Sequence, residues 1–413
     1  MERPAPRSRS VLTLGAPPEG RGVVLSAAEH PPCFGALDLD AVARLAAEVH
    51  DALAPRGLLV PDEDAAYGAA ERRIGRGLAE LLQGPELREV SRRLEGSRAR
   101  AALNGEPLDL LLDLRDPALF SLPWELLELI PAGEPLGGCR VARLMDGVEL
   151  TVEDGGGLEV QIWSPTPEDP DCARVEAALN ATLGTLPHVR RARADEPPGD
   201  GPWRILHVIC HGGARGEPVL ELGQQRALDA ATLALVLKPR VEGAALVVLD
   251  VCGAAAGDEP AALPAWRVVD AGAAACLAPR AALDVEASIA MSGALYAALS
   301  AGEPLMDAVR ASRRQVAALG LPDPSARWWT LTLVTSAPAV LDLTPLRGPS
   351  PVIPGLDRAA PDAAAVLTRA AELASTQGFF GLEHLALALS RLAEPPPLIA
   401  LAQPHLLAIA ARA

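Results

Sequence analysis

The chain has 413 residues, of which 49% are hydrophobic, and it carries a formal net charge of −16 at pH 7. This length predicts roughly two to three domains, and the acidic balance argues against a nucleic-acid-binding protein. Six cysteines are spread along the chain without a C-x-x-C pair, which is typical of a reducing compartment. No apolar run approaches the ~18 residues that cross a membrane, so we expect a cytoplasmic protein without a membrane segment.

The basic residues are unusual in kind, because Lys238 is the only lysine and all the others are arginine. Together with the high alanine, proline and glycine content, this indicates coding bias in a GC-rich genome. We therefore do not interpret arginine clusters as functional sites. The run at 189–193 is expected to be a solvated loop.

Residues 1–155 are predicted to form an N-terminal α/β portion that belongs to the following domain or supports it. Trp124 and Glu125 are expected to serve packing and helix capping there. The predicted elements are strands at 11–14, 23–26 and 107–117, helical segments at 40–53 and 68–100, a loop starting a helix at 120–129, and a hairpin over 139–154 turned at Asp146-Gly147.

Apolar strands alternate with helices over 156–343, which predicts an α/β domain with a mostly parallel sheet flanked by helices. The expected strands are 158–166, 205–211, 245–252, 273–279 and 327–338. The expected helices are 171–184, 229–237, 287–302 and 304–320.

A histidine and a cysteine each close an apolar strand of this domain, and each is followed by glycine: His211-Gly212 and Cys252-Gly253. In open α/β sheets, ligands bind at the carboxyl ends of the strands. An imidazole and a thiol delivered there form a candidate base and nucleophile. We predict Cys252 as nucleophile and His211 as general base, with the N–H groups of Gly212 and Cys252 holding the oxyanion. The alternative is a buried strand-end cysteine and a turn histidine.

Asp250 stands two residues before Cys252 and shares its side of the strand. A carboxylate in so apolar a run needs a partner. It is interpreted as the floor of a specificity pocket, or alternatively as a cap on a local backbone N–H. Cys210 points to the opposite face from His211 and is expected in the core. His207 lies too far from His211 to share a metal, and we expect no metal or cofactor.

Residues 68–340 resemble the CHAT family of caspase-like domains. The resemblance rests on four motifs in order: PLDLLLDLRDPALFSLPWELLEL, the His211-Gly212-Gly213 strand end, LDVCGAAAG, and ASIAMSGALYAALSAGEPLMDAVRASRRQV. It implies a caspase-like catalytic domain over 156–343 that acts as a cysteine endopeptidase on a protein substrate, activated by a partner in a bacterial regulatory or defence system. Asp284 would follow the substrate-binding strand as a second pocket acid.

Several caspase-like peptidases that resemble this chain place an aspartate two residues before the cysteine and cut after arginine or lysine. We therefore predict cleavage after arginine, with lysine second. The alternative is a catalytically silent CHAT-type scaffold that keeps the fold for binding. The presence of both His211 and Cys252 with their glycines favours the protease, because a scaffold need not keep them.

The C-terminal part of the chain begins with a predicted linker at 344–355, which is rich in proline and glycine. Residues 356–413 are predicted to form a small all-helical domain. Within it, residues 363–392 resemble one Clp N-terminal repeat, on the basis of an A-x-E-L-A helix, a glycine turn and Glu383-His384-Leu385 opening a second helix. The resemblance implies an interaction module that binds an activator or adaptor protein.

Overall fold

The computed structural model describes the greater part of the first 342 residues. The described ranges are 9–16, 22–27, 30–53, 63–103, 106–120, 122–130, 138–145, 158–165, 168–186, 189–192, 203–210, 219–221, 227–250, 264–280, 283–319 and 331–342. The predicted linker at 344–355 and the predicted helical module at 356–413 lie outside them.

Most strands of the described chain join one eleven-stranded sheet in the order β3-β2-β1-β4-β5-β13-β12-β11-β8-β6-β7. Their bounds are β1 (Arg9–Ala16), β2 (Gly22–Ala27), β3 (His30–Ala36), β4 (Asp109–Leu114), β5 (Arg140–Leu144), β6 (Leu158–Trp163), β7 (Val189–Ala192), β8 (Trp203–Ile209), β11 (Leu246–Asp250), β12 (Ala275–Pro279) and β13 (Leu331–Thr335). A separate antiparallel pair is formed by β9 (Val219–Glu221) and β10 (Ala227–Asp229).

The main sheet is mostly parallel. Its antiparallel pairings are β1 with β2, β2 with β3, and β12 with β13. All its other described neighbours run parallel. The predicted fold class, an α/β protein with a mostly parallel sheet flanked by helices, is therefore confirmed for the described part of the chain.

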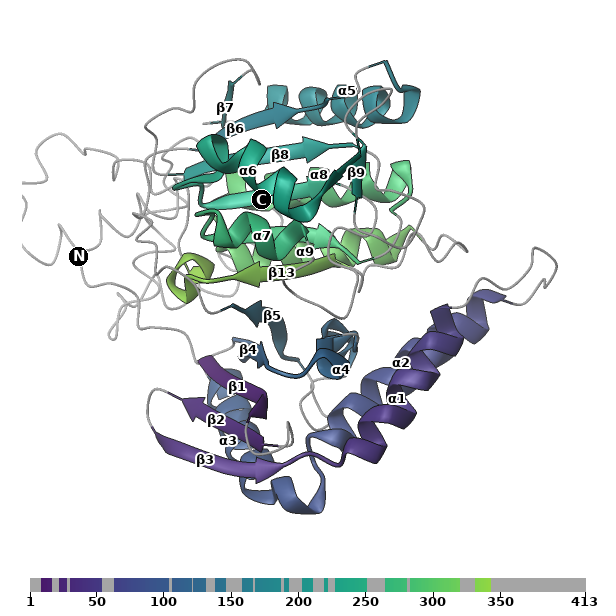
Figure 1. Cartoon of the computed structure of the whole chain (residues 1–413), viewed down its shortest axis with the longest axis vertical. Coiled ribbons are helices and arrows are strands. Elements are labelled where there is room, and N and C mark those ends of the chain that lie inside the picture. Colours follow the sequence, from purple (N-terminus) through teal and green to yellow (C-terminus); the bar gives the residue numbers. More distant parts are fainter. Residues whose placement is uncertain are drawn as a thin grey trace, which may run out of the picture.

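Helices cover both faces of this sheet. Figure 1 shows α6 and α7 in front of the strands from β8 to β13, and α8 and α9 behind them. The helices are α1 (Leu39–Leu53), α2 (Glu63–Leu81), α3 (Arg88–Leu103), α4 (Pro117–Phe120), α5 (Pro170–Thr185), α6 (Ala230–Val241), α7 (Pro264–Asp270), α8 (Val285–Ser300) and α9 (Leu305–Ala318), with short 3₁₀ turns η1 (Pro85–Leu87), η2 (Trp124–Leu129) and η7 (Pro338–Asp342). Burial on both faces explains why the central strands are continuous apolar runs.

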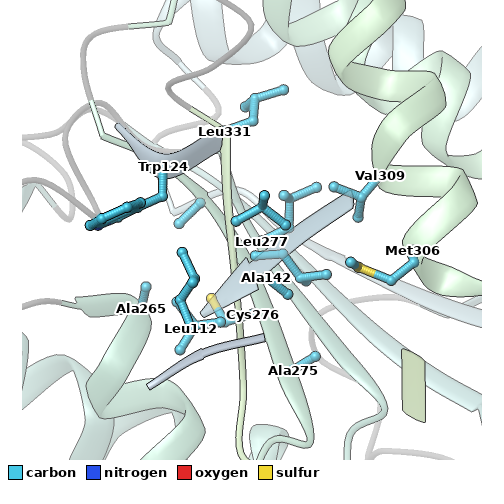
Figure 2. Close-up of a cluster of buried hydrophobic side chains, with 14 of the residues drawn as sticks. Leu112, Trp124, Ala142, Ala265, Ala275, Cys276, Leu277, Met306, Val309 and Leu331 are labelled. Atoms are coloured by element: carbon cyan, nitrogen blue, oxygen red, sulfur yellow. The ribbon is translucent and has the colours of Figure 1, made fainter. Parts of the chain in front are cut away.

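The N-terminal portion and the later strands share one sheet and one core. Strand β5 pairs with β13 through Val334 opposite Arg143 and Thr335 opposite Leu144. Figure 2 shows side chains from β4, η2 and β5 packed with others from β12, β13, α7 and α9. The labelled members of this cluster are Leu112, Trp124, Ala142, Ala265, Ala275, Cys276, Leu277, Met306, Val309 and Leu331, all of them buried.

A buried ion pair lies at this junction. The Nε and Nη2 of Arg143 donate to the two carboxylate oxygens of Glu125 at 3.0 Å each, and the two side chains are 1% and 0% exposed. Thr332 on β13 donates its hydroxyl to the same carboxylate. Burial acts to raise the pKa of Glu125, but the charges of Arg143, Arg280 and Arg313 lower it below its ordinary value. Glu125 therefore joins β5 and β13, a role beyond the packing and capping predicted for it.

Further buried arginines bind the same region. Arg313 on α9 donates to the carbonyl of Leu331 at 3.0 and 2.8 Å and also pairs with Glu128. Arg140 on β5 donates to Asp109 on β4 at 2.6 Å. These contacts are partnered charges of the kind that a protein interior tolerates. These arginines therefore stabilise the fold, a role that the arginine-rich composition did not predict.

Two local predictions are wrong for identifiable reasons. The first predicted strand of the hairpin over 139–154 is β5, but β5 is not a hairpin strand at Leu144, which has β4 on one side and β13 on the other, both parallel. The predicted turn and return strand at 146–154 lie outside the described residues. The run at 189–193 is not simply a loop, because residues 189–192 form the edge strand β7 beside β6. The helical stretch at 68–100 is confirmed with one interruption, where Pro85 opens η1 between α2 and α3.

The first testable prediction concerns the Glu125–Arg143 pair. Glu125→Ala leaves a buried guanidinium without its counterion, which should cost about 3–5 kcal/mol of unfolding free energy. Urea denaturation of the full chain at pH 7 measures the loss. The pKa of Glu125 is lower in the folded chain than the ~4.3 of an unfolded one. The stabilisation that the Glu125–Arg143 pair gives the folded chain is therefore fully present above pH ~4.3 and is lost as the pH falls through the folded-state pKa of Glu125.

A matched control is Glu89→Ala, which removes a carboxylate that pairs with Arg92 and Arg93 on the exposed side of α3. Exposed pairs contribute little, so the denaturation midpoint should stay close to that of the wild type. Equal shifts for the two variants would show that the buried pair has no special role.

Candidate functional site

The described part of the candidate site is the carboxyl edge of β8 and β11. These strands are parallel neighbours in register from Leu246 opposite Ile205 to Asp250 opposite Ile209. The N–H of Cys210 donates to the carbonyl of Asp250 at 3.3 Å, which extends the pairing by one step. Both strands therefore end together at the same edge of the sheet.

This edge adjoins a reversal in strand order. Strand β6 lies between β7 and β8, so the chain passes from β6 to β7 on one side and returns to β8 on the other. Such a switch point leaves a crevice outside the carboxyl ends of the strands, where ligands of open α/β sheets bind. The topology thus favours a binding site at the ends of β6, β8 and β11.

The predicted reactive residues follow these strand ends. His211 comes two residues after Ile209, and Cys252 two residues after Asp250, so both follow the last registered pair by the same number of residues. His211, Gly212 and Cys252 lie outside the described residues. Their assignment as base, oxyanion donor and nucleophile stays a prediction.

Asp250 is described, and its carboxylate has partners inside the protein. The residue is 8% exposed. The hydroxyl of Ser288 on α8 donates to Oδ2, and Nε2 of His207 lies 3.6 Å from the same oxygen. The partner that an aspartate in this apolar strand needs is therefore provided by side chains of β8 and α8. The two described contacts both fall on Oδ2.

His207 and Tyr296 complete this polar group, and neither was predicted from the sequence as part of the site. Both are fully buried. His207 Nδ1 lies 2.9 Å from the Tyr296 hydroxyl, and the two rings are tilted by 37° with centroids 5.8 Å apart. Burial, and secondarily the charge of Asp250, raises the pKa of Tyr296 well above its ordinary value. The phenol therefore stays protonated, and its O–H group can donate a hydrogen bond to Nδ1 of the imidazole.

A sequence signal for this group existed on the helix. Ser288, Ser292 and Tyr296 follow one another at intervals of four in a helix whose other residues from 287 to 299 are apolar or glycine, which places them on one face. All three are buried. A polar stripe on a buried helix predicts polar partners on the sheet that it covers.

Asp284 and Cys210 have defined surroundings. Asp284 is the N-cap of α8, and its Oδ1 accepts from the N–H groups of Glu286 at 2.7 Å and Ala287 at 3.1 Å. This is ordinary helix capping, and no described contact tests its predicted role as a second pocket acid. Cys210 is 4% exposed, so its expected place in the core is confirmed.

The described residues contain no group of three or more histidine, cysteine, aspartate or glutamate side chains placed to hold a metal ion. Among the same residues, no helix combines the length and apolar character that crossing a membrane requires.

Comparison with known proteins identifies one domain. Residues 158–338 match the family model of the CHAT domain. No curated protein matches the chain. Among solved structures, the chain is similar to two determinations of the Saccharomyces cerevisiae separase–securin complex, at 3.0 and 2.6 Å resolution. They have 10% sequence identity, TM-scores of 0.41 and 0.42, and cover 80% and 79% of this chain. The chain covers 30% of each of those chains.

The second prediction separates the two roles of Asp284. Asp284→Asn keeps an oxygen that accepts from the helix N-terminus, whereas Asp284→Ala removes it and should cost ~1 kcal/mol. If capping is the role, the asparagine variant keeps the thermal midpoint and any cleavage of arginine substrates. Loss of that cleavage at an unchanged midpoint would instead assign the carboxylate to the pocket.

Proposed function

We propose that this chain is a cysteine endopeptidase that cleaves a protein substrate after arginine, and less readily after lysine. The observation that carries the proposal is the parallel pairing of β8 with β11 up to Ile209 and Asp250. In the sequence, a histidine and a cysteine, each followed by glycine, come two residues after these two positions. The match of residues 158–338 to the CHAT domain supports it.

In the proposed mechanism, His211 removes the proton of Cys252 and the thiolate attacks the scissile carbonyl carbon. The N–H groups of Gly212 and Cys252 bind the oxyanion of the tetrahedral intermediate. His211 then returns the proton to the leaving amine, and a thioester to Cys252 remains. Water, activated by His211, hydrolyses the thioester and releases the acid product.

Asp250 is proposed to bind the basic side chain before the scissile bond. It lies two residues before Cys252 in the sequence, a spacing that in a strand puts two side chains on one side. Since each carboxylate oxygen can accept two hydrogen bonds, we assign both oxygens to the substrate, with Oδ2 also accepting from Ser288. A guanidinium matches a carboxylate better than an ammonium does, because it donates two parallel hydrogen bonds. Arginine is therefore preferred over lysine.

The third prediction tests the nucleophile and the base. Cys252→Ala and His211→Ala should each abolish cleavage of an arginine-containing peptide while leaving the thermal midpoint unchanged. An iodoacetamide probe at pH 7 should label Cys252, because an adjacent imidazolium lowers a thiol pKa. Mass spectrometry of the labelled peptides locates the modification.

Buried cysteines are the internal control for this labelling. Burial raises the pKa of the Cys139 thiol to about 12 and also raises that of Cys276. Both should stay unlabelled in the folded chain. Cleavage that persists in Cys252→Ala would refute the mechanism, and an unreactive Cys252 in an inactive chain would favour the silent scaffold.

The fourth prediction concerns specificity. Asp250→Asn removes the negative charge but keeps the shape, so a bound guanidinium loses its counterion. Leaving such a charge unpaired costs about 3–5 kcal/mol, and kcat/KM for arginine substrates should fall at least about a hundredfold. Labelling of Cys252 should continue at the wild-type rate. A matched norleucine substrate, which carries no charge, should be cleaved no worse by the variant than by the wild type.

A further inference from the structure

His207 is a buried titratable side chain that the proposed mechanism does not use. It is fully buried between strands and helix, yet its two ring nitrogens face two different polar groups. Nδ1 lies 2.9 Å from the Tyr296 hydroxyl on α8, and Nε2 lies 3.6 Å from Oδ2 of Asp250 on β11. In the described structure Nε2 makes no hydrogen bond. The ring thus bridges the helix and the strand that leads to Cys252.

The tautomer of His207 determines which way its contact with Tyr296 runs, because a phenol can donate or accept. The charged carboxylate of Asp250 can only accept, which favours the tautomer with its proton on the facing Nε2 and leaves Nδ1 to accept from the phenol. With the phenol donating to Nδ1, the proton of a neutral imidazole lies on Nε2. Nε2 is the ring atom nearest Asp250, so its N–H is available to the carboxylate.

The same carboxylate oxygen is held from a second direction. The Ser288 hydroxyl, which lies two helical turns before Tyr296 on α8, donates to Oδ2 of Asp250. One oxygen is therefore approached by an imidazole from β8 and by a hydroxyl from α8. The hydrogen bond from Ser288 and the adjacent imidazole together favour one orientation of the carboxylate.

We propose that His207, Tyr296 and Ser288 are positioning residues that fix the Asp250 carboxylate in the orientation that receives a substrate guanidinium. We refer to these three residues as the Asp250 clamp. The inference deepens the proposed function and rests on it, since Asp250 is taken as the acid that binds the basic substrate residue. The clamp does not touch the reacting atoms.

An oriented carboxylate matters more for arginine than for lysine. Bidentate pairing needs the carboxylate plane to align with the planar guanidinium, whereas an ammonium binds as a point charge from many directions. Loosening the clamp should therefore reduce affinity for arginine and shift the preference toward lysine. It should leave the reactivity of Cys252 unchanged.

The chain provides a matched control on the same helix. Ser292 lies one turn after Ser288 and is equally buried, at 1% against 2% exposed. Its hydroxyl has no hydrogen-bond partner within the described structure. Ser288→Ala and Ser292→Ala therefore delete the same group from the same helix, and only the first removes a contact to Asp250.

The test measures ligand affinity in full-length protein carrying Cys252→Ala, which prevents turnover. Isothermal titration compares acetyl-arginine amide, acetyl-lysine amide and acetyl-norleucine amide. In Ser288→Ala and Tyr296→Phe, affinity for the arginine ligand should fall about tenfold, the effect of a lost hydrogen bond to a charged group. Affinity for the lysine ligand should fall less, and that for the norleucine ligand should not change. Ser292→Ala should match its parent for all three ligands.

The possible outcomes separate this inference from the proposed function. If the parent binds the arginine ligand more tightly than the norleucine ligand, but Ser288→Ala and Ser292→Ala behave alike, the clamp is refuted and the specificity stands. Equal loss for all three ligands, with a lowered thermal midpoint, would show a purely structural role and would also refute the clamp. If arginine and norleucine bind equally in the parent, the specificity itself is wrong and the clamp falls with it.

Discussion

The buried contact between Glu125 and Arg143 is the constraint on which the arrangement of the described chain depends most. Removing two charges from water costs more than their attraction returns, unless further hydrogen bonds complete the site. Here Arg143 also donates to the carbonyls of Phe120 and Leu122, and Glu125 accepts from Thr332. The two donors, Arg143 on β5 and Thr332 on β13, lie far apart in the sequence. A register that displaced β5 from β13 would remove the hydrogen bond that Thr332 donates to the buried Glu125 carboxylate.

This junction is connected to the candidate site through one carbonyl group. The carbonyl of Leu122 accepts from Arg143 and also from Arg280, at 3.0 Å each. Arg280 directly follows β12, and the chain then reaches Asp284, which caps α8. The position of α8 over β8 and β11 therefore depends partly on the N-terminal portion. The region that matches the CHAT domain model shares its sheet with the strands that precede it.

Sequence patterns predicted where the strands lie better than they predicted the tertiary contacts of individual side chains. Apolar runs at β6, β8, β11 and β12 were identified because full burial on both faces leaves an uninterrupted hydrophobic signature. Strand β3 was missed because Pro31 and Pro32 argue against a strand, although an edge strand tolerates proline. The role of the buried arginines was missed for a different reason. Because all the basic residues but Lys238 are arginine, residue type alone does not single out the structural arginines, and only tertiary contacts, such as that of Arg313 with Leu331, distinguish them.

In the candidate site, too, the sequence around one residue shows that it needs a partner but does not show which residue that partner is. That Asp250 needs a partner follows from one strand, since a carboxylate among valines and leucines is costly alone. The identity of that partner does not follow, because Ser288 is 38 positions away and the His207–Tyr296 contact spans 89. Both partners lie on elements that flank the strand leading to Cys252. Under the proposed function, only Val251 separates the acid from the nucleophile in the sequence, so holding Asp250 in place also restricts where the thiolate can meet a substrate carbonyl.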